Sequence, residues 1–162
     1  MLGGNKMAKV IRIDHIGVAV RDVDEAVAKY QRVLGAELVG NVDLTMQGNK
    51  TRAAYLKVGD GLMVMDGAVD PDGFIAKFIE KRGEGLHHIA LVVDDLDGYV
   101  KELEAKGVKI PHRESFGPMR REILLSPKDL CGVVMQVIEW KEGDEPTLEE
   151  RIERLRRFLA SQ

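Results

Sequence analysis

The sequence predicts an α+β fold: two tandem βαβββ modules form a curved, cup-like mixed sheet, and a helix follows at the C-terminus. Three observations support this prediction. One stretch of the 162-residue chain repeats after 73 residues, each copy changes from helical to strand periodicity after a glycine, and an amphipathic stripe closes the chain. The expected boundaries are 1–8 for a disordered N-terminus, 9–142 for the domain, 11–68 and 85–140 for its modules, 72–83 for a linker helix and 146–162 for the C-terminal helix.

The repeat is visible in the residues themselves. The segment Asp14–Asp24 aligns without a gap on the segment His87–Asp97. In each copy a histidine, His15 or His88, opens an apolar run that closes on an acidic turn. Because self-similarity at a fixed spacing marks repeated structural units, we expect two equivalent modules.

Each apolar run leads into a predicted helix. Asp22 and Glu25 form a capping pair at the start of the first helix, and Gly35 suits its left-handed stop. The second helix ends at Lys106 and Gly107. The apolar stripes that define the two helices are Val23, Ala26, Val27, Tyr30, Val33 and Leu34 in the first, and Leu96, Tyr99, Val100 and Leu103 in the second.

After each helix, short β-rich runs predict three strands. The Gly59–Gly61 and Ser126–Asp129 segments supply hairpin turns. The expected strands are 36–42, 52–58 and 62–66 in the first module, and 108–111, 120–125 and 132–140 in the second.

Two further helices lie outside the modules. Phe74, Ile75, Phe78 and Ile79 predict a short linker helix that stops at Gly83. In the tail, Pro146 and Thr147 with Glu150 form a helix start. The tail stripe comprises Leu148, Ile152, Leu155, Phe158 and Leu159, and it either docks on the chain's own sheet or forms a dimer contact.

Composition excludes several classes of protein. The chain has 44% hydrophobic and 31% charged residues, so it can bury a hydrophobic core without disulfide bonds or a structural metal ion. A single cysteine, Cys131, and the lack of a signal-like opening predict a cytoplasmic protein. The longest apolar run, Ile89–Val93, is too short to span a membrane. A net charge of -3 and 5% aromatic residues argue against nucleic-acid binding and favour a small-molecule or protein partner, of which we expect a small-molecule substrate.

Four histidines are the main candidate metal ligands. The repeat relates His15 to His88, and equivalent strands of two half-sheets can bring them to one divalent metal ion. His87 neighbours His88 on a strand and is expected on the opposite face. His112 lies in a polar segment, His112–Ser115, which we interpret as an exposed loop.

The strings Ile13–Val20 (IDHIGVAV) and Ile75–Ala90 (IAKFIEKRGEGLHHIA) closely resemble methylmalonyl-CoA epimerases, a family of the vicinal oxygen chelate superfamily that also holds glyoxalase I, bleomycin-resistance proteins and extradiol dioxygenases. Ser126–Lys128 followed by Gly132–Met135 strengthens the resemblance, which spans residues 11–140. In that family each module contributes two ligands to one metal ion, which chelates the substrate and stabilises an enolate while glutamates move the proton.

The resemblance assigns roles to individual positions. His15 and His88 match the ligands of the first strands, and Gln136 stands where the last strand of module two normally presents a glutamate. In module one, the equivalent ligand position corresponds best to Val64, whose side chain has no oxygen donor. The position of the other proton-moving glutamate falls near Ala53, which is inert.

Because of these departures, the family positions supply no carboxylate that could act as the catalytic base. Glu122 is the candidate catalytic carboxylate, with an exposed edge carboxylate as the alternative interpretation, and Glu139 is a weaker candidate. Lys50, Arg52 and Arg121 are candidates to bind a substrate phosphate or carboxylate, unless they form a solvated surface. Gln47 and Arg120 belong to the same polar set.

Three functions remain open. The first is a metal-dependent isomerase or lyase of the epimerase and glyoxalase I type, acting through an enolate on a small acyl thioester, such as a CoA thioester, or on a hydroxycarbonyl. Its cofactor would be zinc, cobalt, nickel or iron, bound by His15, His88 and Gln136, in a homodimer. The second is a metal-free ligand-binding protein of the bleomycin-resistance kind, which the apolar trio Met63–Met65 favours. The third is an iron-dependent dioxygenase, against which Gln136 counts because that chemistry uses a carboxylate there.

Overall fold

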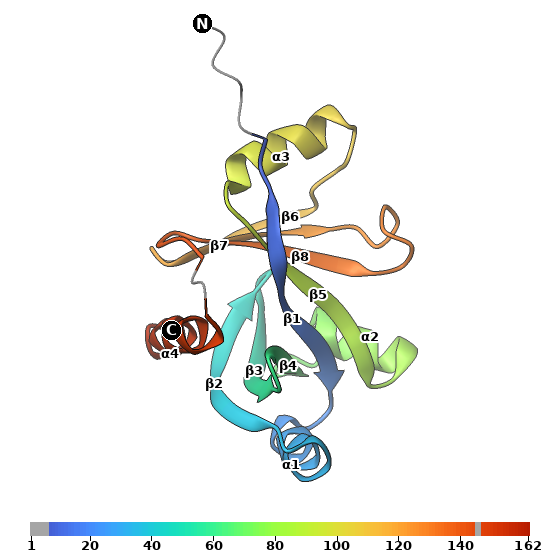
Figure 1. The fold of residues 1–162 in the computed structure, drawn as a ribbon. Coiled ribbons are helices and arrows are strands. Elements are labelled where there is room, and N and C mark those ends of the chain that lie inside the picture. Colours follow the sequence, from blue (N-terminus) through green and yellow to red (C-terminus); the bar gives the residue numbers. More distant parts are fainter. Residues whose placement is uncertain (1–6, 145–146) are drawn as a thin grey trace, which may run out of the picture. The chain divides into compact units, whose positions relative to one another are not determined.

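The computed structural model describes residues 7–144 and 147–162 (Figure 1). Residues 1–6 of the N-terminus expected to be disordered, 1–8, lie outside these described residues, as does the helix start expected at Pro146. The elements in chain order are β1 (Val10–Val20), α1 (Val23–Leu34), β2 (Glu37–Met46), β3 (Asn49–Val58), β4 (Gly61–Ala68), α2 (Phe74–Arg82), β5 (Gly85–Val93), α3 (Leu96–Ala105), β6 (His112–Phe116), β7 (Arg120–Leu125), β8 (Val134–Trp140) and α4 (Leu148–Ala160).

The strands confirm the predicted repeat. They are hydrogen-bonded in the order β2-β3-β4-β1-β5-β8-β7-β6, so β1 to β4 and β5 to β8 follow the same order within their own modules. β1 pairs with β4 in parallel, whereas the β2–β3, β3–β4, β6–β7 and β7–β8 pairs are antiparallel. The sheet is therefore mixed, and the α+β class is confirmed.

The described chain clusters into two compact units. We call residues 14–89 and 147–162 the first unit, and residues 7–13 and 90–144 the second unit. β1 and β5 each contribute residues to both. The two units are described separately below.

In the first unit, α1 forms where its caps predict. The side chain of Asp22 accepts a hydrogen bond from the backbone N–H of Glu25, and Gly35 ends the helix at φ 65°. The buried face of α1 packs on β1, β3 and β4. This core comprises Val18, Val20, Val23, Ala26, Val27, Ala36, Ala54, Leu56 and Met65.

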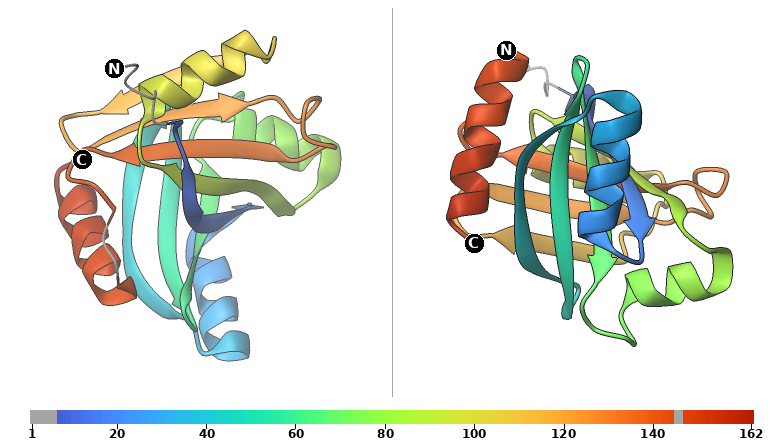
Figure 2. Two further views of the ribbon diagram at one scale, coloured as in Figure 1. Left: turned by 45° about the horizontal axis from the view of Figure 1, so that its top comes forward. Right: turned by 90° about the horizontal axis from the view of Figure 1, so that it is seen from below.

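The helix α4 lies along β2 of its own chain (Figure 2). Thr147 and Glu150 form the predicted capping box. Phe158 is fully buried, and Gly40 of β2 permits the close approach, since a Cβ there would lie 2.9 Å from Cδ1 of Leu159. Of the two placements left open by the sequence, docking on the chain's own sheet is the one observed.

In the second unit, α3 covers one face of β7 and β8. Asp95 caps the helix through the backbone N–H of Gly98, and the chain turns at Gly107 with φ 79°. The core beneath the helix comprises Val93, Leu96, Val100, Ile123, Leu125 and Val137.

Two strand predictions need correction. The strand expected at 108–111 is absent, and the segment His112–Ser115, expected to be a loop, belongs to strand β6. β6 is the last strand in the sheet order and pairs only with β7, and an edge strand tolerates polar side chains that a central strand would not. Val108 and Ile110 still pack on the core, but without strand geometry.

The β2–β3 connection also differs from expectation. It is a tight turn at Gln47 and Gly48, whose φ angles of 51° and 74° suit a two-residue hairpin. Lys50 therefore lies on β3, ahead of the strand start expected at 52, and Arg52 lies on β3 as expected. Among the described helices, none is long and apolar enough to cross a membrane.

Candidate functional site

The structure brings together the two histidines that the repeat relates. In the first unit, Nε2 of His15 lies 3.2 Å from Nε2 of His88, and the two rings are nearly perpendicular at 86°. Two metal–nitrogen bonds of about 2.05 Å that meet at about 90–110° would separate their nitrogens by about 2.9–3.4 Å. The pair thus has the spacing of two ligands of one metal ion.

A carboxylate fixes the orientation of His15. Nδ1 of His15 lies 2.8 Å from Oδ2 of Asp14, and the His15 side chain is only 3% exposed. Because an ionised carboxylate only accepts hydrogen bonds, Nδ1 carries the proton and Nε2 presents its lone pair toward His88. This arrangement is typical of histidines that bind metal ions.

The ring of His88 packs against the backbone of β1 at Gly17. A Cβ built on Gly17 would lie 2.1 Å from Cε1 of His88, so only glycine leaves room for this ring. Nδ1 of His88 lies 3.9 Å from Oδ2 of Asp66 and 3.0 Å from Nδ1 of His87. Sequence reasoning did not consider Asp66, although its place two residues beyond Val64 puts it on the same face of β4.

His87 turns toward α2, where it packs edge-on against Phe78 with ring centroids 4.9 Å apart. Burial lowers the pKa of His87 to about 4, so the ring is neutral near pH 7. Its contact with Nδ1 of His88 was not predicted, since alternation along a strand places neighbours on opposite faces.

The first unit supplies an incomplete set of metal ligands. In the part of the chain that the structure describes, no cluster of three or more His, Cys, Asp or Glu side chains is arranged to hold a metal ion. Val64 and Ala53, at the positions where the resemblance places a ligand and a base, are buried apolar residues as the sequence indicates. The histidine pair fits a divalent ion whose remaining positions are filled by other donors, such as an amide, water or substrate.

In the second unit, Gln136 presents an unsatisfied oxygen. Its side chain is 2% exposed, and its Oε1 has no hydrogen-bond partner among the described residues. Because leaving a buried amide oxygen without a partner costs about 1–3 kcal/mol, such an atom is a candidate to bind a ligand. Gln136 lies opposite Leu124 in the β7–β8 register.

Glu122 is buried and not an exposed edge carboxylate, so that alternative is wrong. β7 lies between β6 and β8, and Glu122 is 3% exposed. Its Oε2 pairs with Nη2 of Arg120 at 3.1 Å. The guanidinium of Arg120 in turn stacks over the rings of Phe116 at 4.8 Å and Trp140 at 5.5 Å, so Arg120 is buried as well.

Glu122 and Gln136 share one face of the β7–β8 pair. Glu122 is opposite Ile138, two residues beyond Gln136, and directly opposed residues point to the same side. Arg121 and Glu139 are opposite each other one residue further along, and so occupy the other face.

The cations predicted to bind substrate have carboxylate partners or lie in solvent. Arg121 donates to Glu139 at 2.6 Å and to Asp97 at 3.1 Å, and these bonds, first of all those to Glu139, raise the pKa of Arg121. Arg52 pairs with Asp24 at 3.2 Å on an exposed surface. Lys50 is exposed.

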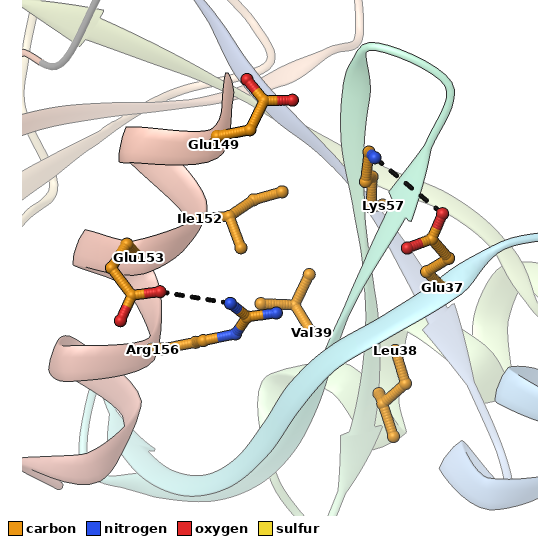
Figure 3. A pocket seen from close by; sticks show the side chains of 8 residues that line it. All are labelled: Glu37, Leu38, Val39, Lys57, Glu149, Ile152, Glu153 and Arg156. Carbon is orange, nitrogen blue, oxygen red and sulfur yellow. Dashed lines mark hydrogen bonds and ion pairs between the residues drawn. The ribbon is translucent and has the colours of Figure 1, made fainter. Parts of the chain in front are cut away.

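A separate hollow of about 270 Å³ lies between α4 and the β2–β3 hairpin (Figure 3). Its rim carries two ion pairs, Lys57 with Glu37 at 3.9 Å and Arg156 with Glu153 at 3.2 Å. None of the candidate site residues lines it. The complete lining comprises Glu37, Leu38, Val39, Lys57, Glu149, Ile152, Glu153 and Arg156.

Comparison with known proteins defines the class. The model of the glyoxalase/bleomycin resistance protein/dioxygenase superfamily matches residues 14–120. The chain belongs to this superfamily.

Within the superfamily, the similar proteins include several methylmalonyl-CoA epimerases. The human mitochondrial enzyme is 30% identical over 129 residues, which cover 78% of this chain and 72% of that protein. The crystal structure of the Mycobacterium tuberculosis epimerase is 31% identical with a TM-score of 0.72, covering 80% of this chain and 88% of that one. A variant of the Streptomyces coelicolor epimerase in complex with 2-nitronate-propionyl-CoA is 30% identical with a TM-score of 0.73, covering 85% of this chain and 100% of that one.

Proposed function

We propose that this chain is a metal-dependent epimerase of a small acyl-CoA thioester. The observation that carries the proposal is the pair of facing Nε2 atoms of His15 and His88, 3.2 Å apart. The similar epimerases support the substrate class, since one is described in complex with a propionyl-CoA analogue. They also favour an isomerase over a lyase.

Each residue has a proposed role. His15 and His88 would hold a divalent ion, which would supply a Lewis acid for substrate carbonyl oxygens. Asp14 holds the His15 ring in place through Nδ1. Gln136 would supply an amide oxygen as a further ligand, as the family resemblance implies.

Epimerisation moves one proton and changes no oxidation state. A base removes the proton next to the thioester carbonyl, and a proton then returns to the opposite face of the same carbon. We assign the removal to Glu122, because it is the buried carboxylate on the Gln136 face of β7 and β8. Arg120 orients that carboxylate.

For the CoA phosphates, Lys50, Arg52 and Arg121 remain the proposed contacts. Lys50 receives the most weight, because Arg52 and Arg121 already pair with carboxylates of the protein. The proposed homodimer is tested by light scattering at micromolar concentration, where the mass of a single chain would contradict it.

A metal-free binding protein is the second candidate. The buried apolar residues Val64 and Ala53 favour it, since each replaces a polar group that the epimerase chemistry uses. An iron-dependent dioxygenase is disfavoured, because it needs two histidines and a carboxylate on one metal ion and the described residues contain no such cluster.

Two measurements separate these candidates. Protein purified without a histidine tag is analysed for bound metal, and deuterium incorporation into methylmalonyl-CoA is followed in heavy water. We expect stoichiometric metal and exchange above background, with both lost in His15→Ala and His88→Ala. His112→Ala is the matched control, since His112 is exposed on the edge strand β6.

The opposite result is equally clear. A metal-free wild-type protein that shows no exchange after addition of zinc, cobalt, nickel or iron would overturn the epimerase proposal. The binding-protein candidate would then be preferred.

A further inference from the structure

Asp66 is a buried carboxylate that neither the family resemblance nor the mechanism above assigns. It lies on β4, paired with Ala19 of β1 and Ala53 of β3, and is 5% exposed. Both neighbours are small and apolar. Burying a carboxylate among such residues is unfavourable unless a charged or polar group nearby compensates it.

The group that Asp66 faces is the imidazole of His88. Oδ2 of Asp66 lies 3.9 Å from Nδ1 of His88, and the two side chains are 7% and 10% exposed. A side-chain movement of about 1 Å would bring the two atoms to hydrogen-bond distance.

Each of the two histidines therefore has a carboxylate near its Nδ1, at 2.8 Å for His15 and at 3.9 Å for His88. Asp14 lies at Nδ1 of His15, and Asp66 lies at Nδ1 of His88, while the two Nε2 atoms face each other. Metal-binding histidines commonly donate their second ring N–H to a carboxylate, which fixes the tautomer and the direction of the lone pair.

The position of Asp66 along β4 is also informative. The resemblance places an oxygen ligand at Val64, but Val64 cannot serve. Asp66 is the next residue of β4 on the same face, so the carboxylate stands one pleat further along the strand.

We propose that Asp66 is a positioning residue for His88. Its carboxylate accepts the Nδ1–H of His88, keeps Nε2 directed at the point shared with His15, and places a negative charge close to the bound cation. The inference rests on the proposed metal site, because the orientation of Nε2 matters only if an ion binds there.

His87 determines how large the effect should be. Its Nδ1 lies 3.0 Å from Nδ1 of His88 and provides a second acceptor for the same proton. Loss of Asp66 should therefore weaken metal binding without abolishing it, within the roughly 10- to 100-fold range typical of such supporting carboxylates.

The test is a titration of the metal-free protein with Co²⁺ in the presence of a competing chelator. The visible spectrum of the bound ion reports its coordination, so the readout does not depend on enzymatic activity. Asp66→Ala should bind Co²⁺ about 10- to 100-fold more weakly than wild type, with a changed spectrum. Asp66→Asn keeps an acceptor oxygen without the charge, and should fall between the two.

Asp60→Asn is the control, since it removes an exposed carboxylate from the turn that precedes β4. Thermal unfolding of each variant without metal excludes simple misfolding. If Asp66→Ala binds Co²⁺ as tightly as wild type while His88→Ala does not bind it, the role of Asp66 is refuted and the metal site stands. If wild type itself binds no Co²⁺, both proposals fail.

Discussion

The Nε2 atoms of His15 and His88 lie 3.2 Å apart, although 73 residues separate them in the chain. The same spacing of 73 relates the two copies of the internal repeat, so the contact joins equivalent positions of the two modules. Each module contributes one nitrogen, and neither module could form the pair alone.

Gly17 should be required for this pair. In Gly17→Ala, the new Cβ would overlap the His88 ring, which must move away from His15. We expect a loss of unfolding free energy of about 1–3 kcal/mol, typical of overpacking, together with weakened metal binding. Urea denaturation and metal titration measure the two effects.

Gly61→Ala is the matched control, because a Cβ there meets its nearest neighbour at an ordinary 3.7 Å. If Gly17→Ala bound metal with wild-type affinity, the position of the His88 ring against Gly17 would not be needed for metal binding.

Glu122 should be important for stability as well as catalysis. Glu122→Gln removes the carboxylate from its buried ion pair with Arg120, and breaking such a pair costs about 3–5 kcal/mol. The matched control is Glu104→Gln, which breaks the exposed pair with Arg113 and should cost less than about 1 kcal/mol. Equal losses in urea denaturation would argue against a compensating role for Glu122.

The catalytic assignment of Glu122 has a separate readout. At a temperature where Glu122→Gln remains folded, deuterium exchange into methylmalonyl-CoA should fall by about 100-fold or more, as expected on removal of a general base. Exchange at the wild-type rate would assign the base to another residue.

His87 predicts a pH dependence of stability. Its pKa is about 4 in the folded protein against 6.5 as its ordinary value, so the unfolded chain takes up the proton first as the pH falls. The stability that neutral His87 contributes is fully present above about pH 6.5 and is lost as the pH falls toward 4. Between pH 7.5 and 4, wild type should lose about 1–3 kcal/mol more than His87→Leu.

Both proteins are measured by urea denaturation with chelator present, so that metal release does not contribute. Parallel pH profiles for wild type and His87→Leu would contradict the prediction.

The docking of α4 on β2 should make a large contribution to stability. Phe158 is fully buried, and Phe158→Ala should lower the unfolding free energy by about 3–5 kcal/mol. Leu159 faces Gly40, so Gly40→Val should also be destabilising. An unchanged denaturation midpoint in Phe158→Ala would show that α4 is not part of the cooperative unit.

Much of the fold follows from local sequence signals. The caps at Asp22 and Thr147 start helices α1 and α4 as predicted, and Asp95 caps α3 in the same way, because these side chains satisfy backbone N–H groups of their own helix. The repeat predicted the module order and related His15 to His88. Such signals depend on residues that are close in sequence, so they can be recognised without the tertiary structure.

The structural predictions failed where contacts between residues distant in sequence determine the local structure. The polar segment His112–Ser115 forms strand β6 because β7 offers it a partner, and no local pattern reports that partner. For Glu122 the sequence left an inward catalytic carboxylate and an exposed edge carboxylate open, and it did not predict the buried pair with Arg120, whose guanidinium lies over the rings of Phe116 and Trp140.

The sequence by itself therefore determined the class of fold, the order of the elements and the two histidines, since periodicity, capping and repetition are properties of the chain. Only the tertiary structure decided which charges are buried and what they face. It placed Asp66 near His88, set Arg120 against Glu122 and left the oxygen of Gln136 without a hydrogen-bond partner in the described part of the chain. The physical reason is that desolvation and pairing depend on strand register and packing, which bring distant residues together.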